Sequence, residues 1–205
     1  MAMTITYGFR NGSVYVNLTN RCPCSCRFCL RSNAPGILGS DSLWLEREPT
    51  LDEVWESVSA ALASSPRELV FCGYGEPTER LDVLLETAAR AKAAQPGLKV
   101  RVNTNGLSDL IAGRPTAPLF AGKADVLSIS LNTDDPAEYL EVCRPKFGEA
   151  AYPAMLAFAR QAVSYVPEVV MSVVGEPVTD AAKQARCRAV AEGLGARLRV
   201  RPFEG

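Results

Sequence analysis

Four cysteines stand close together in the segment Cys22–Cys29, which reads CPCSCRFC. Cysteine thiolates bind soft metals and iron–sulfur clusters, and dense local thiols in a chain without a secretory signal favour a metal over disulfides. Cys22, Cys26 and Cys29 follow the spacing Cys-x3-Cys-x2-Cys. Three thiolates on one short loop can bind three irons of a [4Fe–4S] cube, which normally takes four ligands. The fourth iron would remain open to a small molecule, and that opening distinguishes a catalyst from an electron carrier.

Two other interpretations use Cys24, which lies inside the first gap of this spacing. All four cysteines could bind structural zinc, although zinc ribbons prefer two separated Cys-x2-Cys pairs. With Cys24 as the fourth ligand, the cluster would belong to a ferredoxin-like electron carrier. Cys72, Cys143 and Cys187 are scattered and are expected to be small core residues. The sequence contains no histidine, which removes mixed Cys/His zinc sites and histidine acid–base catalysis from consideration.

The composition is that of an ordinary globular protein, with 205 residues, 47% of them apolar and 22% charged, and a net charge of -1. A dedicated nucleic-acid binder is usually more basic, so no nucleic-acid partner is expected. No apolar run approaches the roughly 18 residues of a membrane span, and the amino terminus lacks the apolar region of a signal peptide. We therefore expect a cytoplasmic protein without a membrane partner, organised as one domain over residues 1–205.

Strands and helices alternate along the sequence. The turn signal Asn11-Gly12 separates strands at Ile5–Phe9 and Ser13–Leu18, and the second strand leads into the cysteine loop. Thr50 and Glu53 form a capping-box signature at the start of the first helix. The helices expected after the loop are Leu51–Ser64, Leu81–Ala94, Pro136–Val142, Pro153–Tyr165 and Asp180–Leu194, and the strands are Glu68–Cys72, Lys99–Asn103, Val126–Leu131, Glu168–Val174 and Arg197–Arg201.

Several of these strands alternate apolar and polar residues, as Val100-Arg101-Val102-Asn103 does. Strands that alternate with helices indicate a parallel sheet, and right-handed crossovers place the helices on one side of it. The apolar side chains would face the helices, and the polar side chains would line a shared interior. We therefore expect an α/β fold, a partial (β/α)6 TIM-like barrel with an N-terminal β-hairpin, rather than an open sheet with a solvated face. Reactive groups in such barrels gather where the strands end.

The cysteine loop resembles that of the radical SAM superfamily, whose motif is Cys-x3-Cys-x-aromatic-Cys, with Phe28 at the aromatic position. Gly73-Tyr74-Gly75-Glu76-Pro77 resembles the family's Gly-Gly-Glu-Pro turn, and the strand order agrees over essentially the whole chain. The resemblance implies a single radical SAM core domain that holds a [4Fe–4S] cluster through Cys22, Cys26 and Cys29. S-adenosylmethionine (SAM) would bind the open iron. One electron from an external donor of flavodoxin or ferredoxin type would cleave SAM to a 5′-deoxyadenosyl radical, which takes hydrogen from a substrate.

The resemblance also assigns residues around the cluster. It implies that the glycine-rich turn contacts the SAM amino group and that the ends of later strands contact the ribose and carboxylate. The residues expected at this cofactor site are Phe28, Gly73, Gly75, Glu76, Asn103, Ser130, Asn132, Arg144 and Ser172. Three arginines on the polar interior, Arg101, Arg199 and Arg201, would favour an anionic substrate, because guanidinium groups pair bidentately with carboxylate or phosphate.

Within the superfamily, the lead-in YVNLTNRC at Tyr15–Cys22 and the tripeptide Val173-Val174-Gly175 resemble the small TatD-associated radical SAM proteins. Other candidates of similar size are a glycyl-radical-enzyme activase and a deazaguanine-type synthase. The alternative from another class is the iron–sulfur electron carrier, whose cluster would be redox-active but would ignore SAM. Formation of 5′-deoxyadenosine discriminates between the enzyme and the carrier.

Overall fold

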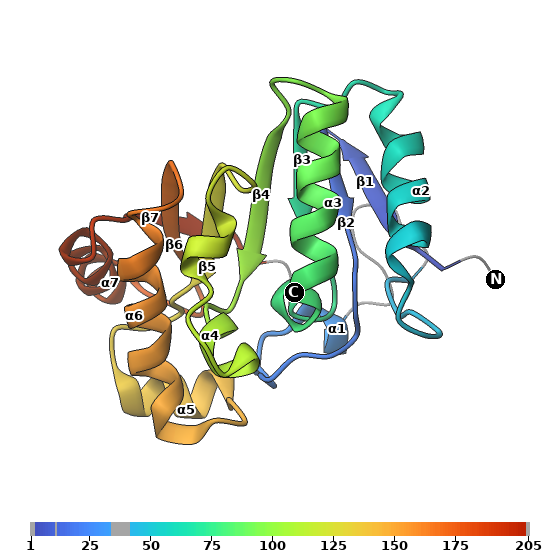
Figure 1. Ribbon diagram of the computed structural model, residues 1–205. Coiled ribbons are helices and arrows are strands. Elements are labelled where there is room, and N and C mark those ends of the chain that lie inside the picture. Colours follow the sequence, from blue (N-terminus) through green and yellow to red (C-terminus); the bar gives the residue numbers. More distant parts are fainter. Residues whose placement is uncertain (1–2, 11, 34–41, 204–205) are drawn as a thin grey trace.

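The computed structural model describes residues 3–10, 12–33 and 42–203. Seven strands form one sheet in the order in which they occur along the chain (Figure 1). The first two strands are antiparallel, and every later pair of neighbours is parallel. The expected hairpin is therefore confirmed, although Asn11 of its turn lies outside the described residues. The strands are β1 (Thr6–Arg10), β2 (Ser13–Val16), β3 (Glu68–Phe71), β4 (Lys99–Thr104), β5 (Val126–Ser130), β6 (Glu168–Val174) and β7 (Arg197–Arg201).

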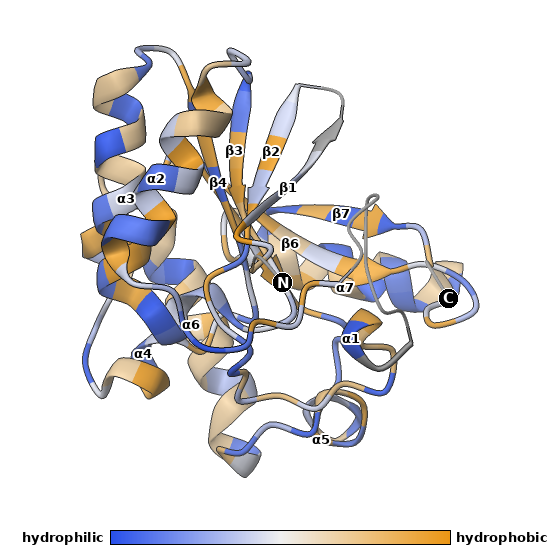
Figure 2. Ribbon diagram, turned by 90° about the vertical axis from the view of Figure 1, so that its right-hand side faces the viewer, coloured by the Kyte–Doolittle hydropathy of each residue, from blue (hydrophilic) through white to orange (hydrophobic). Residues whose placement is uncertain are grey.

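Each parallel crossover contains at least one helix, and the main helices lie on one face of the sheet (Figures 1 and 2). The fold is thus the expected partial TIM-like barrel with an N-terminal hairpin. Within the described ranges, none of the helices has the length and apolar character needed to cross a membrane. The helices are α1 (Leu30–Asn33), α2 (Leu51–Leu62), α3 (Leu81–Ala94), α4 (Ser108–Ala112), α5 (Pro136–Cys143), α6 (Ala151–Ala162) and α7 (Ala181–Gly193), with 3-10 turns η1 (Pro77–Arg80), η2 (Ala117–Phe120) and η3 (Gly148–Ala150).

The short helices α1 and α4 and the three 3-10 turns were not expected from the sequence. A segment of three to five residues spans about one turn, which is too short to show a helical repeat of apolar residues. The longer helices agree closely with expectation, and α3 has the predicted bounds. The capping box of α2 is also confirmed. Thr50 Oγ1 accepts the Glu53 backbone N–H at 3.2 Å, and Glu53 Oε2 accepts that of Thr50 at 2.8 Å.

The alternation along the strands sorts side chains between two faces, which Figure 2 shows as changes of colour along the ribbons. Val100 and Val102 of β4 are fully buried in the main apolar core, whereas Arg101 and Asn103 are half-buried on the other face. Ser128 on β5 also belongs to that second face and is buried. The second face is therefore covered at β4 and β5, as a curved sheet predicts, whereas Arg199 on β7 is exposed.

The parallel strands end at the lower edge of the sheet in Figure 1, where α1, α4 and α5 also lie. The cysteine loop follows β2 and so begins at this edge. The turn after β3 and the segment after β5 begin there as well. The fold thus brings segments far apart in the sequence to one edge.

Candidate cluster and cofactor site

The cysteine loop gathers its thiols into one group. The side chain of Cys24 is buried, and those of Cys22, Cys26 and Cys29 are half-buried. The Cys24 thiol lies within hydrogen-bonding range of the sulfurs of both Cys22 and Cys26. All four are free thiols. The loop therefore presents three partly accessible sulfurs around one that points into the protein.

The end of α5 holds the loop through three backbone hydrogen bonds. Ser25 and Arg27 donate their N–H groups to the carbonyls of Cys143 and Val142, both at 3.0 Å. In the opposite direction, the N–H of Lys146 donates to the carbonyl of Pro23 at 2.8 Å. The two segments run side by side, so the loop has a fixed backbone rather than a free one.

Cys143 belongs to the thiol group, a role that the sequence analysis missed. It is buried, as expected for a small core residue, and its thiol hydrogen-bonds to the sulfur of Cys26. The Nδ2 of Asn132 donates to the Cys143 sulfur at 3.2 Å. The one sequence signal is its position next to Arg144, which the resemblance assigns to the site.

The surroundings favour thiolates at two of the three proposed ligands. Hydrogen bonds from the thiols of Cys143 and Cys24 lower the pKa of Cys26 to about 4 against the cost of burial. The hydrogen bond from Cys24 likewise lowers the pKa of Cys22. The pKa of Cys24 is raised by these same bonds and by burial, so Cys24 is the protonated donor. Burial raises the pKa of Cys29.

Two further groups outside the motif act on these sulfurs. The Nδ2 of Asn105 lies 3.8 Å from the Cys24 sulfur and 4.0 Å from the Cys22 sulfur. Arg31 donates to the Cys24 carbonyl at 3.3 Å, and its positive charge also lowers the pKa of Cys26. Both groups favour negative charge on the loop, as N–H donors and cations do.

The turn Gly73–Pro77 packs directly on the lead-in to the cysteine loop. A Cβ atom at Gly75 would lie 2.2 Å from the Thr19 carbonyl oxygen, and one at Gly73 would lie 2.1 Å from Asn17 Oδ1. The N–H of Glu76 donates to the Arg21 carbonyl at 2.8 Å. The two glycines are therefore required by the close approach of this turn to the end of β2 and the loop.

Glu76 is fully enclosed and uses both carboxylate oxygens within the protein. Its Oε1 accepts from the Thr78 N–H and from the hydroxyls of Thr78 and Thr104, while its Oε2 accepts from the Asn105 N–H at 2.7 Å. Burial raises the pKa of Glu76, and these donors oppose the rise. The carboxylate therefore joins the glycine-rich turn to the end of β4.

The strand ends supply polar groups with spare hydrogen-bonding capacity. The Oδ1 atoms of Asn103 and Asn132 are buried and accept no hydrogen bond from the described residues. Ser130 lies opposite Ser172 in the β5–β6 register, and the Ser172 carbonyl accepts the N–H of Asn132 at 3.2 Å. An amide oxygen without a donor is costly when buried, so these two atoms suit a ligand that brings N–H or O–H groups.

Phe28 and Arg144 lie at the margins of the loop. Phe28 is half-buried. Arg144 caps α5 in the left-handed region, with φ of 46°, and its side chain is exposed. Its N–H donates to the Leu140 carbonyl at 3.1 Å, so the backbone turns sharply directly after Cys143.

The three interior arginines do not lie together at the strand ends. Arg101 donates to Glu68 Oε2 at 2.9 Å and pairs in register with Val126, the first residue of β5. Arg101 and Arg199 line a cavity of about 70 Å³ near the strand starts. Arg201 is the last residue of β7 and lies opposite Val174. Of the three, Arg201 is therefore the one at the edge of the cysteine loop.

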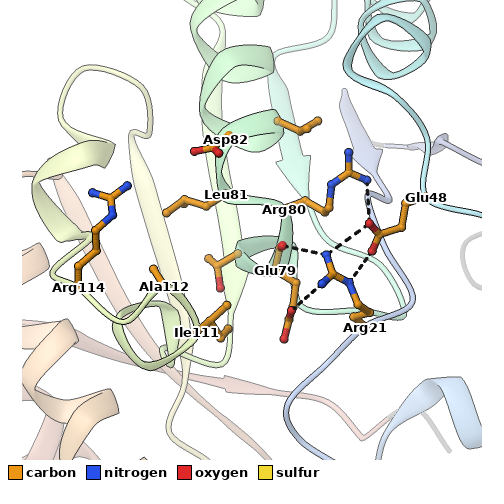
Figure 3. Close-up of a pocket in the computed structure, with 11 residues that line it drawn as sticks. Arg21, Glu48, Glu79, Arg80, Leu81, Asp82, Ile111, Ala112 and Arg114 are labelled. Atoms are coloured by element: carbon orange, nitrogen blue, oxygen red, sulfur yellow. Dashed lines mark hydrogen bonds and ion pairs between the residues drawn. The ribbon is translucent and has the colours of Figure 1, made fainter.

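A larger cavity, of about 440 Å³, lies outside the barrel beside the loop (Figure 3). Arg21, the residue before Cys22, lines it and pairs with Glu48 at 2.6 Å and Glu79 at 3.5 Å. Arg80 also pairs with Glu48, at 3.4 Å. The charges on this side of the loop are thus anchored by ion pairs.

The donor set fits an iron–sulfur cluster, because cluster irons are held by cysteine thiolates. Among the described residues, no group of three or more His, Cys, Asp or Glu side chains is placed to hold a metal ion. A cluster binds each thiolate to a different iron, so its ligands need not meet at one point. The thiolate is the metal-binding form, and the loop favours it at Cys22 and Cys26.

Part of this sequence is similar to the sequences of known proteins. GTP 3′,8-cyclase of Nitrobacter hamburgensis is 30% identical over 144 residues, and molybdenum cofactor biosynthesis protein 1 of Drosophila melanogaster is 26% identical over 144 residues. These matches cover 69% and 70% of this chain but 39% and 24% of the relatives. The chain therefore spans less than half the length of the curated relatives it matches.

A solved structure shares the fold. A radical SAM methyltransferase from Sphaerobacter thermophilus superposes with a TM-score of 0.68 at 19% identity, over 94% of this chain and 56% of that one. The family model described as "Radical SAM superfamily" matches residues 16–185, which include the cysteine loop, the glycine-rich turn and strands β3 to β6. Members of that family use a [4Fe–4S] cluster and SAM. The chain belongs to the radical SAM superfamily.

Proposed function

We propose that Cys22, Cys26 and Cys29 each bind one iron of a [4Fe–4S] cluster and leave the fourth iron to SAM. One observation carries this proposal: Cys22, Cys26 and Cys29 are half-buried on the loop, whereas Cys24, which could have been the fourth ligand, is buried. Cys143 is buried as well. The chain thus offers three partly accessible ligands on the loop.

The SAM site that we propose lies beside the loop at the strand ends. Asn103 and Asn132 offer buried amide oxygens to the ammonium or ribose hydroxyl groups of SAM, which are donors. Gly73 and Gly75 let the backbone of the turn approach the loop, and Glu76 keeps that turn in place. Phe28, Ser130, Arg144 and Ser172 complete the proposed set.

When bound, a reduced cluster supplies the electron that splits SAM into methionine and a 5′-deoxyadenosyl radical. The chain's own residues hold and orient the reactants. The α5 end fixes the loop backbone, Glu76 fixes the turn, and Asn132 and Ser172 are buried at the strand ends. Enclosure of this kind protects a reactive species from solvent.

The substrate is proposed to lie in the polar interior. Arg201 stands at the strand-end edge and suits an anionic group, whereas Arg101 lies near the strand starts beside Glu68. The cyclases among the relatives act on GTP by name, which makes a nucleoside triphosphate the first compound to test. The assignment to the TatD-associated proteins rests on two short sequence matches and has no support from these relatives. The electron donor is proposed to be of flavodoxin or ferredoxin type, in the cytoplasm.

The test is anaerobic reconstitution with iron and sulfide, followed by SAM and dithionite, with 5′-deoxyadenosine measured by chromatography. We expect the product from the unmodified chain and from Cys24→Ala. The variants Cys22→Ala, Cys26→Ala and Cys29→Ala should form none. An intact cluster that yields no 5′-deoxyadenosine would overturn the proposal in favour of the electron carrier.

A further inference from the structure

We propose that the outer surface of the cysteine loop is a docking surface for an acidic one-electron carrier protein. The basic docking surface consists of Arg21 and Arg27 from the loop and Lys146 from the segment after α5. The inference rests on the proposed function, because a carrier is needed only if the loop holds a redox group. It adds the place where that carrier binds and the charge by which it is recognised.

Hydrogen bonds and ion pairs show that the three residues form one continuous surface. The backbone of Arg27 bonds to the end of α5 and that of Lys146 bonds to Pro23 within the loop. Lys146 Nζ lies 3.9 Å from Glu79 Oε1, and the other oxygen of Glu79 lies 3.5 Å from the Arg21 guanidinium. Two segments more than a hundred residues apart in the sequence thus place their cations side by side.

The exposed groups on this surface are mainly positive. The side chains of Arg21 and Lys146 are 55% and 56% exposed, whereas that of Glu79, which contacts both, is 9% exposed. Arg27 is exposed and makes no ion pair within the described residues. Glu48, paired with Arg21, partly offsets the charge at one margin, and the exposed Arg144 adds to it at another. The surface therefore presents cations to solvent around the largely covered Glu79. Glu48 lies closer to Arg21, at 2.6 Å, and is 37% exposed, so it offsets that one cation.

The location suits electron entry. The strand-end side of the loop faces the site proposed for SAM and substrate, so the outer side is the one left for a protein partner. The same short loop carries both the three ligand cysteines and two of the three cations. The chain as a whole has a net charge of -1, so the positive surface is local. Local charge of this kind steers an oppositely charged partner to one place.

The transfer itself is a single step. The reduced carrier gives up one electron and is oxidised by one, and the group held by Cys22, Cys26 and Cys29 is reduced by one. No proton or atom needs to pass between the proteins. The surface has only to bring the two redox groups close together and release the oxidised carrier.

The experiment compares two reductants on one reconstituted protein. The variant Arg27→Glu/Lys146→Glu reverses two cations that have no part in the proposed ligand or SAM set. Its control is Arg160→Glu/Arg188→Glu, which makes the same change of net charge at exposed positions on α6 and α7, away from the loop in Figure 1. The reductants are dithionite, a small anion, and a reduced flavodoxin of strongly negative net charge. The readouts are bleaching of the cluster absorption, formation of 5′-deoxyadenosine and flavodoxin affinity by calorimetry.

We expect cluster reduction by flavodoxin to slow by about tenfold in the loop variant at low salt, with weaker binding and a smaller dependence on salt. Dithionite carries little charge and needs no docking surface, so it should be slowed far less than flavodoxin in the loop variant. An unchanged rate with flavodoxin would overturn the docking surface, as would equal slowing of both variants. If the loop variant fails to assemble its cluster, the experiment is repeated with Arg27→Gln/Lys146→Gln and the same criteria. The slowing of reduction by flavodoxin should then be smaller, because the two charges are removed and not reversed.

Two other outcomes keep this inference separate from the proposed function. Normal cluster reduction without any 5′-deoxyadenosine would overturn SAM cleavage while leaving the docking result valid. Tight binding of a duplex oligonucleotide to the same cations, with unchanged reduction by flavodoxin, would assign the surface to nucleic acid and overturn the carrier.

Discussion

Polar residues have different partners at the two edges of the sheet. Where the strands begin, charges satisfy one another: Arg101 pairs with Glu68 at 2.9 Å, and Lys99 and Arg197 both pair with Glu168. Where the strands end, the group is made of thiols and amides, and the Oδ1 atoms of Asn103 and Asn132 lack donors within the described residues. At the first edge ion pairs join most of the charges, although the Nε of Arg101 has no partner within the described residues. At the second edge the unpartnered atoms are amide oxygens, which suit a ligand that brings donors.

The two edges also differ in how they hold a carboxylate, half-buried at Glu68 and buried at Glu76. Glu68, at the strand starts, meets a guanidinium and the Ser13 hydroxyl. Glu76, at the strand ends, meets two hydroxyls and two backbone N–H groups, with no cation among its hydrogen-bond partners. The negative charge of a carboxylate held by neutral donors is not compensated by a neighbouring cation, whereas that of a carboxylate paired with arginine is.

The largest effect is expected from the thiols at the strand ends. Each of Cys22→Ala, Cys26→Ala and Cys29→Ala removes a ligand, so iron content and 5′-deoxyadenosine should fall at least a hundredfold, on the order of a lost catalytic group. Cys143→Ala removes the thiol beside Cys26 and the sulfur that accepts from Asn132, but no proposed ligand, so it should retain the cluster with a changed midpoint potential. The potential is read by a redox titration followed in the visible spectrum.

Cys24→Ala is the matched control for those variants, since it removes a buried thiol from the same loop. It should assemble the cluster. If Cys24→Ala lost its iron while any one of the three ligand variants kept the iron content of the unmodified chain, the assignment of ligands would be wrong.

The next effect concerns the turn that approaches the loop. Gly75→Ala would place a methyl group 2.2 Å from a backbone oxygen, so the turn and the loop must separate. The expected loss of stability is about 3 kcal/mol, or roughly 10 °C in the melting midpoint. The measurement is thermal denaturation followed by circular dichroism.

Gly193→Ala is the control for this change. Gly193 ends α7, and a Cβ atom there meets nothing within 4 Å. That substitution should leave stability equal or slightly higher, because alanine restricts the unfolded chain. Equal behaviour of the two variants would mean that the close approach at Gly75 contributes nothing to the fold.

These two glycines illustrate what sequence could and could not predict. The Gly-Glu-Pro turn was located from the sequence, but the reason for Gly75 is the Thr19 carbonyl, and that contact depends on the tertiary fold. The bounds of α3, β6 and β7 were predicted as observed, because apolar periodicity and caps are local signals.

Contacts between distant segments escaped the sequence analysis. Cys143 looked like a core residue because 117 positions separate it from Cys26, and only the packing of α5 on the loop brings them together. Arg101 was assigned to the substrate because it alternates onto the interior face. The alternation fixes the face but not the height along the barrel, and the ion pair with Glu68 depends on that height.

A smaller effect is expected at Glu76. In Glu76→Gln, an amide nitrogen that cannot accept a hydrogen bond replaces one of the two carboxylate oxygens. If it replaces Oε1, three donors lose their acceptor, and if it replaces Oε2, the Asn105 N–H loses its acceptor. The free energy of unfolding should fall by about 2 kcal/mol. Glu86→Gln is the control, an exposed residue in an i,i+4 pair with Arg90, and should cost under about 0.5 kcal/mol.

The same variant tests the pH dependence of stability. Burial raises the pKa of Glu76 above its ordinary value, so the folded state binds the proton more tightly than the unfolded state. Stability from this group is present below the ordinary pKa of 4.5 and is lost as the pH rises through the raised value. As the pH rises above 4.5, the free energy of unfolding should therefore fall less in Glu76→Gln than in the unmodified chain. A steeper fall in the variant would reverse the assigned sign.

The smallest effect is expected at the strand starts, where Arg101→Met removes an ion pair with side chains that are 15% and 21% exposed. The unfolding free energy should drop by about 1 kcal/mol, since Glu68 keeps its bond from Ser13 and gains water. Formation of 5′-deoxyadenosine should stay within about twofold of the unmodified chain, because the lost charge lies away from the cysteine loop. Arg201→Met, at the other edge, should instead alter the response to an anionic substrate such as GTP. If Arg101→Met affected that response more than Arg201→Met, the strand starts would be part of the substrate site and the contrast between the two edges would fail.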